Sequence, residues 1–164
     1  MATDAPTLTH VNPAGGVKMV DVSGKADSLR TAVAAGRVLV GEEAYQLITE
    51  NKVRKGDVLG AAQIAGILGA KQTSKLIPLC HDVQVKGVEL EFVPNEEDHA
   101  IDIRALAKTT GPTGVEMEAL TAVSVAALTI YDMCKSISKA IRISDIHLLA
   151  KTGGQSGDYR KGQE

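Results

Sequence analysis

One stretch of the sequence limits the possible folds more than any other. The segment from Ala119 to Tyr131 carries no charged side chain. Just before it, Thr113 and Glu116 match the capping box that opens many helices, and we expect one helix from there to about Lys139. A helix that is apolar on nearly all sides has to be covered on both of its sides. A sheet can cover one side, and a second copy of the chain is the natural cover for the other.

The composition also favours an oligomer of globular domains. Aromatic residues make up only 2% of the 164-residue chain and glycine occurs 16 times, so each core residue buries little surface. The hydrophobic and charged fractions, 44% and 23%, are those of a globular protein. The net charge of −2 gives no electrostatic basis for nucleic-acid binding. No apolar run reaches the roughly 18 residues of a membrane span, so we expect no membrane partner.

The cysteines and histidines give no sign of a metal or a disulfide. Cys80 and Cys134 are the only two cysteines, and they form no C-x-x-C motif, which favours a reduced, cytoplasmic protein. Residues 1–10 lack the apolar core of a signal peptide. His81 follows Cys80 directly, but adjacent residues rarely reach the same ion, so we expect no metal. Small apolar neighbours favour an inert thiol at Cys80.

The remaining chain alternates between helix and strand patterns. Asp57 can cap a helix that runs to about Lys71, and its Gly/Ala face predicts a closely approaching backbone. The alternation slips at Lys86–Gly87 and again near Ser144–Asp145, which indicates two β-bulges. We expect a further helix at 42–51 and strands at 18–22, 31–40, 83–93, 100–108 and 141–150, with 83–93 and 100–108 forming an antiparallel hairpin.

These elements predict a single domain at 17–152. Before it, residues 1–16 contain two prolines and a Gly-Gly pair, so we expect a mobile N-terminal arm. After it, residues 153–164 contain several glycines, and we expect a flexible tail.

One candidate for chemistry is a pair of opposite charges near the end of the long helix. Asp132 and Lys135 are three positions apart, so their side chains can meet on the helix surface. One interpretation is a surface ion pair that contributes little. The other is an acid–base pair at the mouth of an interface pocket, where each group tunes the pKa of the other.

The other candidates are cations at the ends of the expected elements. Lys55 precedes one helix start, Lys71 ends that helix, and Lys151 stands next to Gly153–Gly154. Lysines beside glycines can bind phosphate, because exposed backbone N–H groups add to the charge. Solvated lysines are the simpler interpretation of each position taken alone. Glu116 and Glu118 can be explained as acids that favour the N-terminus of the long helix.

Several strings of residues resemble one family, the cyclic pyranopterin monophosphate synthases of molybdenum cofactor biosynthesis. The resemblance extends from about Leu8 to Tyr159. It is carried by the strings at 8–11, 19–22, 55–58 (KGDV), 76–81 (LIPLCH), 113–121 (TGVEMEALT), 126–135 (AALTIYDMCK) and 149–154 (LAKTGG).

The resemblance implies a ferredoxin-like α+β fold with an antiparallel sheet packed against helices. It implies a homohexamer, a trimer of dimers, with active sites shared between subunits and no cofactor. The substrate would be the cyclised dihydro-GTP intermediate, a triphosphate made from GTP. The product would be cyclic pyranopterin monophosphate, formed with release of pyrophosphate, so the enzyme would be a phosphorus–oxygen lyase.

The resemblance makes 17–152 the catalytic domain and also assigns roles to residues. It makes Asp132 the acid–base candidate and Lys55 and Lys135 catalytic lysines, and Glu116 joins them as a catalytic acid. The family often has proline after the histidine of LIPLCH, whereas this chain has Asp82, a carboxylate that could repel a triphosphate. The residues expected to bind substrate are Leu79, Cys80, His81, Met117, Glu118, Lys71 and Lys151.

Two other functions fit the sequence less well. A phospholigand-binding module without catalysis would have no need of acid–base groups at the helix end, yet Asp132 and Lys135 are both present. A cytosolic RNA-binding protein would be expected to have more aromatic residues and a positive net charge.

Overall fold

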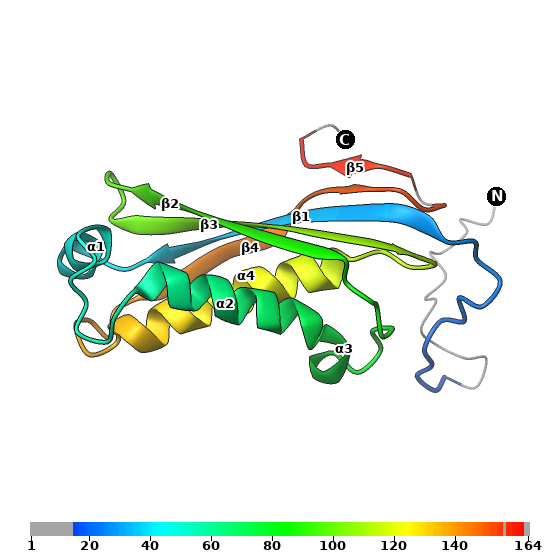
Figure 1. Ribbon diagram of the computed structural model, residues 1–164, viewed down its shortest axis with the longest axis horizontal. Coiled ribbons are helices and arrows are strands. Elements are labelled where there is room, and N and C mark those ends of the chain that lie inside the picture. Colours follow the sequence, from blue (N-terminus) through cyan, green and yellow to red (C-terminus); the bar gives the residue numbers. More distant parts are fainter. Residues whose placement is uncertain (1–14, 156, 163–164) are drawn as a thin grey trace.

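The computed structural model describes residues 15–155 and 157–162 of the chain. Its core is one antiparallel sheet with the strand order β2-β3-β1-β4-β5, and the first four strands follow the ferredoxin-like order (Figure 1). The α+β fold is therefore confirmed. The strands are β1 (Ser28–Leu39), β2 (Gly87–Asn95), β3 (Ala100–Gly111), β4 (Arg142–Thr152) and β5 (Tyr159–Arg160), and the helices are α1 (Glu42–Thr49), α2 (Val58–Lys71), α3 (Thr73–Leu76) and α4 (Glu116–Cys134).

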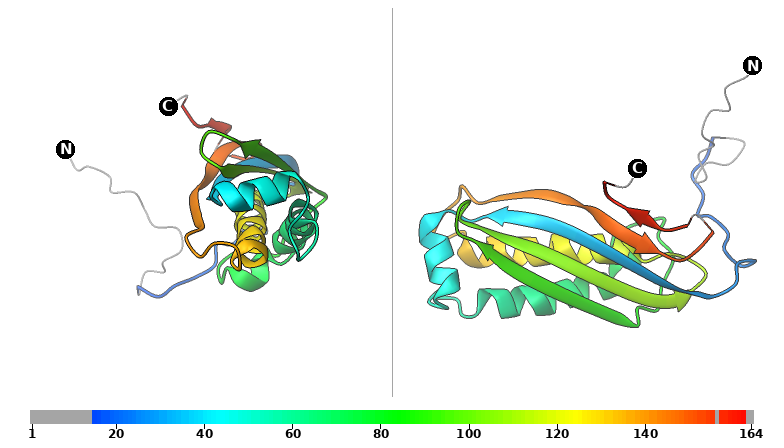
Figure 2. Two further views of the ribbon diagram at one scale, coloured as in Figure 1. Left: turned by 90° about the vertical axis from the view of Figure 1, so that its left-hand side faces the viewer. Right: turned by 90° about the horizontal axis from the view of Figure 1, so that it is seen from above.

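The two long helices cover one face of the sheet, and the described chain leaves the other face open (Figure 2). In β1, Ala32, Ala34 and Val38 are fully buried beneath the helices, whereas Arg37 is on the open face. Because strand side chains alternate between faces, the period-two pattern of β1 and β3 assigns each residue to the core or to the open face. The core is built from aliphatic side chains such as Ile101, Ile103 and Ile130.

Helices α2 and α4 run antiparallel and approach closely through glycines. A Cβ atom added to Gly66 would lie 2.9 Å from the main-chain oxygen of Ala122, and one added to Gly69 would lie 2.7 Å from Cγ2 of Val125. This close approach is what the Gly/Ala face of α2 predicts. The expected cap is also present, since Oδ1 of Asp57 accepts a hydrogen bond of 2.9 Å from the Gly60 N–H.

The long helix α4 is shorter than the sequence suggests at both ends. It begins after Val115 without a side-chain cap, so the capping box at Thr113 and Glu116 is wrong. The carboxylate of Glu116 instead pairs with Lys151. The helix ends at Cys134, because the N–H groups of Ile137 and Ser138 both turn back to its carbonyl oxygen, at 2.8 and 3.2 Å.

The composition and length of α4 would also allow it to cross a membrane. The buried helices of globular proteins share this property. In this chain Ala119, Ala126 and Ile130 are fully buried within the domain, which identifies α4 as a core helix.

Two expectations for the strands are wrong and one is confirmed. Residues 18–22 form no strand, and β2 pairs with β3 without a break from Gly87 onward, so the bulge at Lys86–Gly87 is wrong. The alternation slips there because residues 83–86 precede the strand. In β4 the slip is a true bulge, since Asp145 and Ile146 together face Gly36 and Asp145 has a φ of 55°.

The segments outside the expected domain are described in part. Most of the N-terminal arm expected at 1–16 lies outside the described residues. Within 153–164, Tyr159–Arg160 forms strand β5, which pairs with β4 at the edge of the sheet.

Candidate active site

Three of the predicted catalytic residues meet at the C-terminal end of α4. Nζ of Lys135 lies 2.6 Å from Oδ1 of Asp132. Lys55 arrives from the turn before α2, where Gly56 has a φ of 106°. Its Nζ lies 2.7 Å from the main-chain oxygen of Asp132 and 3.4 Å from Oδ2. The fold therefore gathers Lys55, Asp132 and Lys135, which we call the lysine–aspartate cluster.

Electrostatic interactions within this cluster determine the protonation states of Asp132 and Lys135 in the absence of substrate. Hydrogen bonds from Lys135 and then from Lys55 hold the pKa of Asp132 below its usual value. The hydrogen bond to Asp132 in turn raises the pKa of Lys135. Asp132 is therefore an ionised carboxylate at neutral pH, and Lys135 is a cation. All three side chains are exposed, so a ligand or another chain can reach them.

Five of the seven predicted substrate-binding residues, all except Lys71 and Lys151, line a different hollow at the N-terminal end of α4. This cavity of about 740 Å³, which we call the helix-start cavity, is lined by Leu79, Cys80 and His81 from the segment after α3. Glu116, Met117 and Glu118 from the first turn of α4 line it as well. His81 is fixed there, because its Nε2 lies 2.7 Å from the main-chain oxygen of Val20.

The helix-start cavity favours neutral forms of its buried acids. Burial raises the pKa of Glu118, and the charge of neighbouring Glu116 raises it further. Burial also raises the pKa of the Cys80 thiol, with a smaller effect from Glu118. Glu116 itself is paired, since its Oε1 lies 3.0 Å from Nζ of Lys151. The cavity thus offers a carboxyl group that binds a proton readily beside a carboxylate–ammonium pair.

Two further sequence candidates, Lys71 and Asp82, do not line this cavity. Lys71 is the exposed last residue of α2, on the side where the chain continues into α3 and the cavity segment (Figure 1). Asp82 is turned to Ser74, whose hydroxyl donates a hydrogen bond of 3.1 Å to it. Asp82 does not line the helix-start cavity, and the expected repulsion between its carboxylate and a triphosphate stays a prediction.

A second group of lining residues was not found from the sequence. Val20, Val22 and Lys25, which precede β1, line the helix-start cavity from the side of the N-terminal segment. The alternation at 18–22 suggested a strand, and no local pattern indicates that this segment crosses a cavity. The resemblance of the string at 19–22 was the only signal that could have located it.

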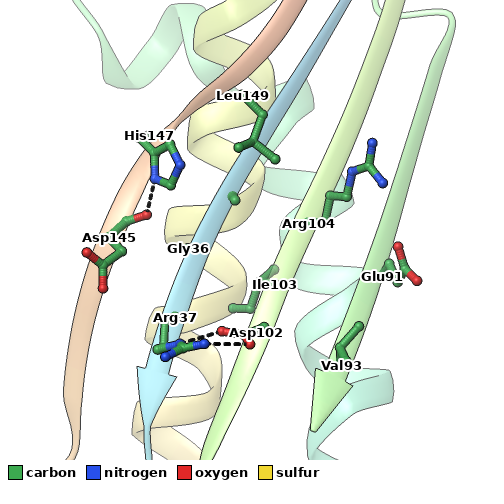
Figure 3. A pocket seen from close by; sticks show the side chains of 11 residues that line it. Gly36, Arg37, Glu91, Val93, Asp102, Ile103, Arg104, Asp145, His147 and Leu149 are labelled. Atoms are coloured by element: carbon green, nitrogen blue, oxygen red, sulfur yellow. Dashed lines mark hydrogen bonds and ion pairs between the residues drawn. The ribbon is translucent and has the colours of Figure 1, made fainter. Parts of the chain in front are cut away.

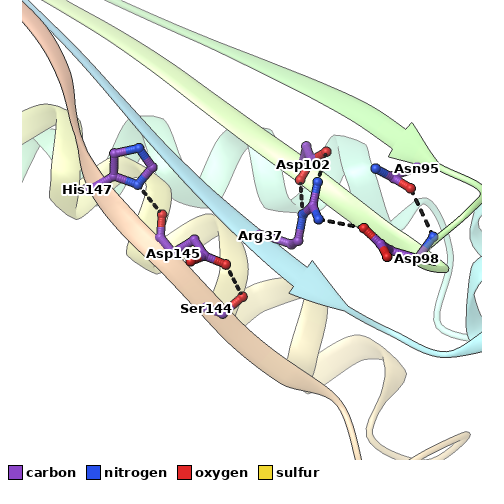
Figure 4. A network of polar contacts seen from close by, with 7 residues as sticks. All are labelled: Arg37, Asn95, Asp98, Asp102, Ser144, Asp145 and His147. Atoms are coloured by element: carbon purple, nitrogen blue, oxygen red, sulfur yellow. Dashed lines mark hydrogen bonds and ion pairs between the residues drawn. The ribbon is translucent and has the colours of Figure 1, made fainter. Parts of the chain in front are cut away.

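A hollow of about 600 Å³ on the open sheet face was also not predicted from the sequence (Figure 3). Two of the charged side chains that line it, Arg37 and Asp102, form an ion pair with each other. Arg37 binds Asp102 through two hydrogen bonds of 2.6 and 2.9 Å and reaches Asp98 at 2.6 Å (Figure 4). The hydrogen bond to Asp102 raises the pKa of Arg37 and lowers that of the carboxyl.

No group of three or more His, Cys, Asp or Glu side chains among residues 15–155 and 157–162 could hold a metal ion. The two cysteines are free and lie at opposite ends of α4, since Cys80 lines the helix-start cavity and Cys134 ends the helix. The site is therefore built from charged and hydrogen-bonding side chains.

Comparison with known proteins identifies the family. Residues 19–154 match the model of the MoaC family, and this range contains the residues of the lysine–aspartate cluster and of the helix-start cavity. The chain belongs to the MoaC family. Strand β5 follows the part that the MoaC model matches.

Individual members of the family are similar over nearly the whole chain. A protein of Salinibacter ruber is 65% identical over 98% of this chain and 95% of its own length. One of Peptoclostridium acidaminophilum is 54% identical over 94% of this chain and 97% of its own length. A mitochondrial protein of Arabidopsis thaliana is 54% identical over 98% of this chain, which covers 60% of that longer protein. All three are named cyclic pyranopterin monophosphate synthase.

Proposed function

We propose that this chain converts the cyclised dihydro-GTP intermediate to cyclic pyranopterin monophosphate and releases pyrophosphate, as a phosphorus–oxygen lyase of molybdenum cofactor biosynthesis. Family membership supports the assignment. The observation that carries it is the lysine–aspartate cluster, in which Lys55 reaches Asp132 across 77 positions of the sequence. An isolated surface ion pair on a helix has no need of a second lysine from a distant turn.

The reaction needs both proton transfer and charge compensation. The pterin ring has to open and close again, which requires a base and an acid within reach of the reacting atoms. The ionised Asp132 can accept a proton, the ammonium group of Lys135 can donate one, and Lys55 can help to stabilise negative charge beside them. Closing the cyclic phosphate forms one P–O bond and breaks the P–O bond to the leaving pyrophosphate, whose charge the lysines can compensate.

The helix-start cavity supplies the complementary groups. Glu118 is held toward its protonated form and can donate a proton or a hydrogen bond. The pair of Glu116 and Lys151 places an ammonium group beside the cavity. We expect Leu79, Cys80, His81 and Met117 to surround the substrate ring, and Lys71 and Lys151 to bind the phosphates.

One chain cannot bring these two groups to a single small substrate. Glu118 and Asp132 lie at opposite ends of α4, about 21 Å apart at about 1.5 Å per residue. We therefore infer that each active site combines the lysine–aspartate cluster of one chain with the helix-start cavity of another. An isologous dimer generates two such sites, because each chain contributes its opposite end to each.

The surface of the chain favours a trimer of dimers, which needs two different contact surfaces. On the helix layer, Ile64, Leu68 and Leu128 are each more than half exposed, and large apolar side chains on one layer are costly to leave in water. The open sheet face is a second uncovered surface, with Val93 48% exposed beside paired charges. We infer a homohexamer, and the two free cysteines support a cytoplasmic location.

The test is turnover of the cyclised dihydro-GTP intermediate by the purified protein. We expect pyrophosphate release in a ratio of one to each product molecule, with the product measured as a fluorescent pterin after oxidation. Tight binding of the intermediate without pyrophosphate release would instead identify a binding module.

A further inference from the structure

The last described residues of the chain include the short strand β5, which packs against the C-terminal end of β4. Strand β5 pairs Tyr159 with Lys151 and Arg160 with Ala150. The N–H of Lys161 donates a hydrogen bond of 2.9 Å to the carbonyl oxygen of Leu149. The C-terminal end of β4 is therefore hydrogen-bonded on both sides, to β1 on one side and to β5 on the other. The end of an edge strand bonded on one side only opens more readily.

Asp158 extends this attachment to the turn that follows β4. Its Oδ1 accepts a hydrogen bond of 3.1 Å from the N–H of Gly153. Gly153 and Gly154 have φ values of 86° and 89°, a conformation that glycine adopts without strain. A Cβ atom at Gly153 would collide with the carbonyl oxygen of Leu29, so the turn lies directly against β1. Asp158 thus holds a tight turn two residues after Lys151.

Strand β5 and the Gly153–Gly154 turn together fix the position of Lys151. Its backbone lies between Ala32 of β1 and Tyr159 of β5, and its side chain reaches Glu116 at 3.0 Å. Both side chains of that ion pair are only about a quarter exposed, at 24% and 27%. A shift of the β4 end would move the ammonium group away from the helix-start cavity.

We propose that Asp158 is a positioning residue, which together with β5 fixes Lys151 and the Gly153–Gly154 turn for the phosphate end of the substrate. This inference rests on the proposed function. Asp158 need not touch the substrate, because its hydrogen bond holds the backbone from which Lys151 projects. Loss of the bond should therefore weaken substrate binding and leave the proton-transfer steps at the lysine–aspartate cluster intact.

The experiment compares Asp158→Ala with Asp158→Asn in the full-length oligomer. Alanine removes the acceptor, whereas asparagine keeps an oxygen at the same distance along the side chain. We expect Asp158→Ala to raise KM roughly five- to tenfold with kcat nearly unchanged, the effect of one lost hydrogen bond, and Asp158→Asn to restore the wild-type KM. Asn95→Ala is the matched control, because Oδ1 of Asn95 accepts a comparable bond of 3.0 Å from the Asp98 N–H in the β2–β3 turn. That variant should keep the wild-type KM.

Hydrogen exchange provides a readout that does not depend on activity. Asp158→Ala should speed amide exchange in 149–154 and leave strand β3, which does not pair with β4, unchanged. If the wild-type enzyme is active and Asp158→Ala has the same KM, this inference is overturned and the proposed function stands. That conclusion holds whether or not amide exchange changes. Failure of Asp158→Asn to restore KM would also overturn the inference. A wild-type protein that did not turn over the intermediate would overturn the proposed function instead.

Discussion

Nζ of Lys55 lies 2.7 Å from the main-chain oxygen of Asp132, in the last turn of α4. This contact ties the turn before α2 to the last turn of α4. It places a second cation beside a carboxylate that Lys135 already holds at 2.6 Å. Two ammonium groups on one exposed carboxylate point to a site for anions and proton transfer.

Replacement of Asp132 tests the acid–base assignment. Asp132→Asn keeps the size and hydrogen-bonding capacity of the side chain, so the oligomer should remain intact while turnover falls by roughly two to four orders of magnitude. Lys135→Ala should have a similar effect, and the double variant should be little worse than either single one, because the pair acts as a unit. Glu50→Gln, which removes the exposed ion pair with Lys52, is the control and should retain full activity. Near wild-type turnover in Asp132→Asn would refute the catalytic assignment.

Glu118 should make the protein less stable as the pH rises. Burial raises its pKa in the folded state, so the folded protein binds a proton that the unfolded chain releases. The destabilisation is absent below the unfolded pKa of about 4.3 and grows as the pH rises through the raised folded value. Glu118→Gln should therefore increase the free energy of unfolding at pH 7 and change it little at pH 4, while activity is lost. Equal effects at both pH values, measured by urea unfolding, would contradict this.

Asp102 should show the opposite pH dependence. The hydrogen bond from Arg37 lowers its folded pKa, so its stabilisation is present above the unfolded pKa of about 3.9 and is lost as the pH falls through the lower folded value. Asp102→Asn should cost roughly 1 kcal/mol or less at pH 7, because the pair is partly exposed, and this cost should shrink as the pH falls below about 3.9. A cost that stayed constant as the pH fell would show that packing, and not charge, carries the effect.

The close contact of α2 with α4 predicts a glycine that cannot be replaced. Gly66→Ala would push a methyl group against the main-chain oxygen of Ala122, which a rotamer change cannot relieve. We expect a loss of roughly 1–3 kcal/mol in thermal or chemical unfolding, although alanine favours helices. Gly24→Ala is the control, since no atom lies within 4 Å of its added Cβ. A stabilised Gly66→Ala protein would rule out the close approach.

Local signals in the sequence predicted the helices and strands best where a single residue determines the backbone conformation, as a helix cap or a β-bulge does. Asp57 caps α2 as expected, and the bulge at Asp145 is present. The prediction failed where tertiary contacts compete with the local pattern. Glu116 fits a capping box, but Lys151 from a distant strand takes its carboxylate. The alternation at 83–86 resembles a strand, but Val83 lies beside the helix-start cavity.

In the candidate active site, too, local contacts could be predicted from the sequence and tertiary contacts could not. The spacing of Asp132 and Lys135 predicts their ion pair, because both positions share one helix face. No spacing rule brings Lys55 to them, since that contact depends on how the turn before α2 packs on α4. Lys25 and the segment from Val20 to Val22 were missed for the same reason.

The most direct test of the account is complementation between two inactive variants. Asp132→Asn damages the lysine–aspartate cluster, and Glu116→Gln damages the helix-start cavity at the other end of α4. If each site joins opposite ends of two chains, every mixed dimer contains one site with both changes and one intact site. After subunits are exchanged at equal amounts, half of the dimers are mixed, so about a quarter of the wild-type turnover should return. Asp132→Asn mixed with Lys55→Ala should stay inactive, because both changes lie in the same half-site. No recovery in the first mixture, or recovery in the second, would contradict the shared active site.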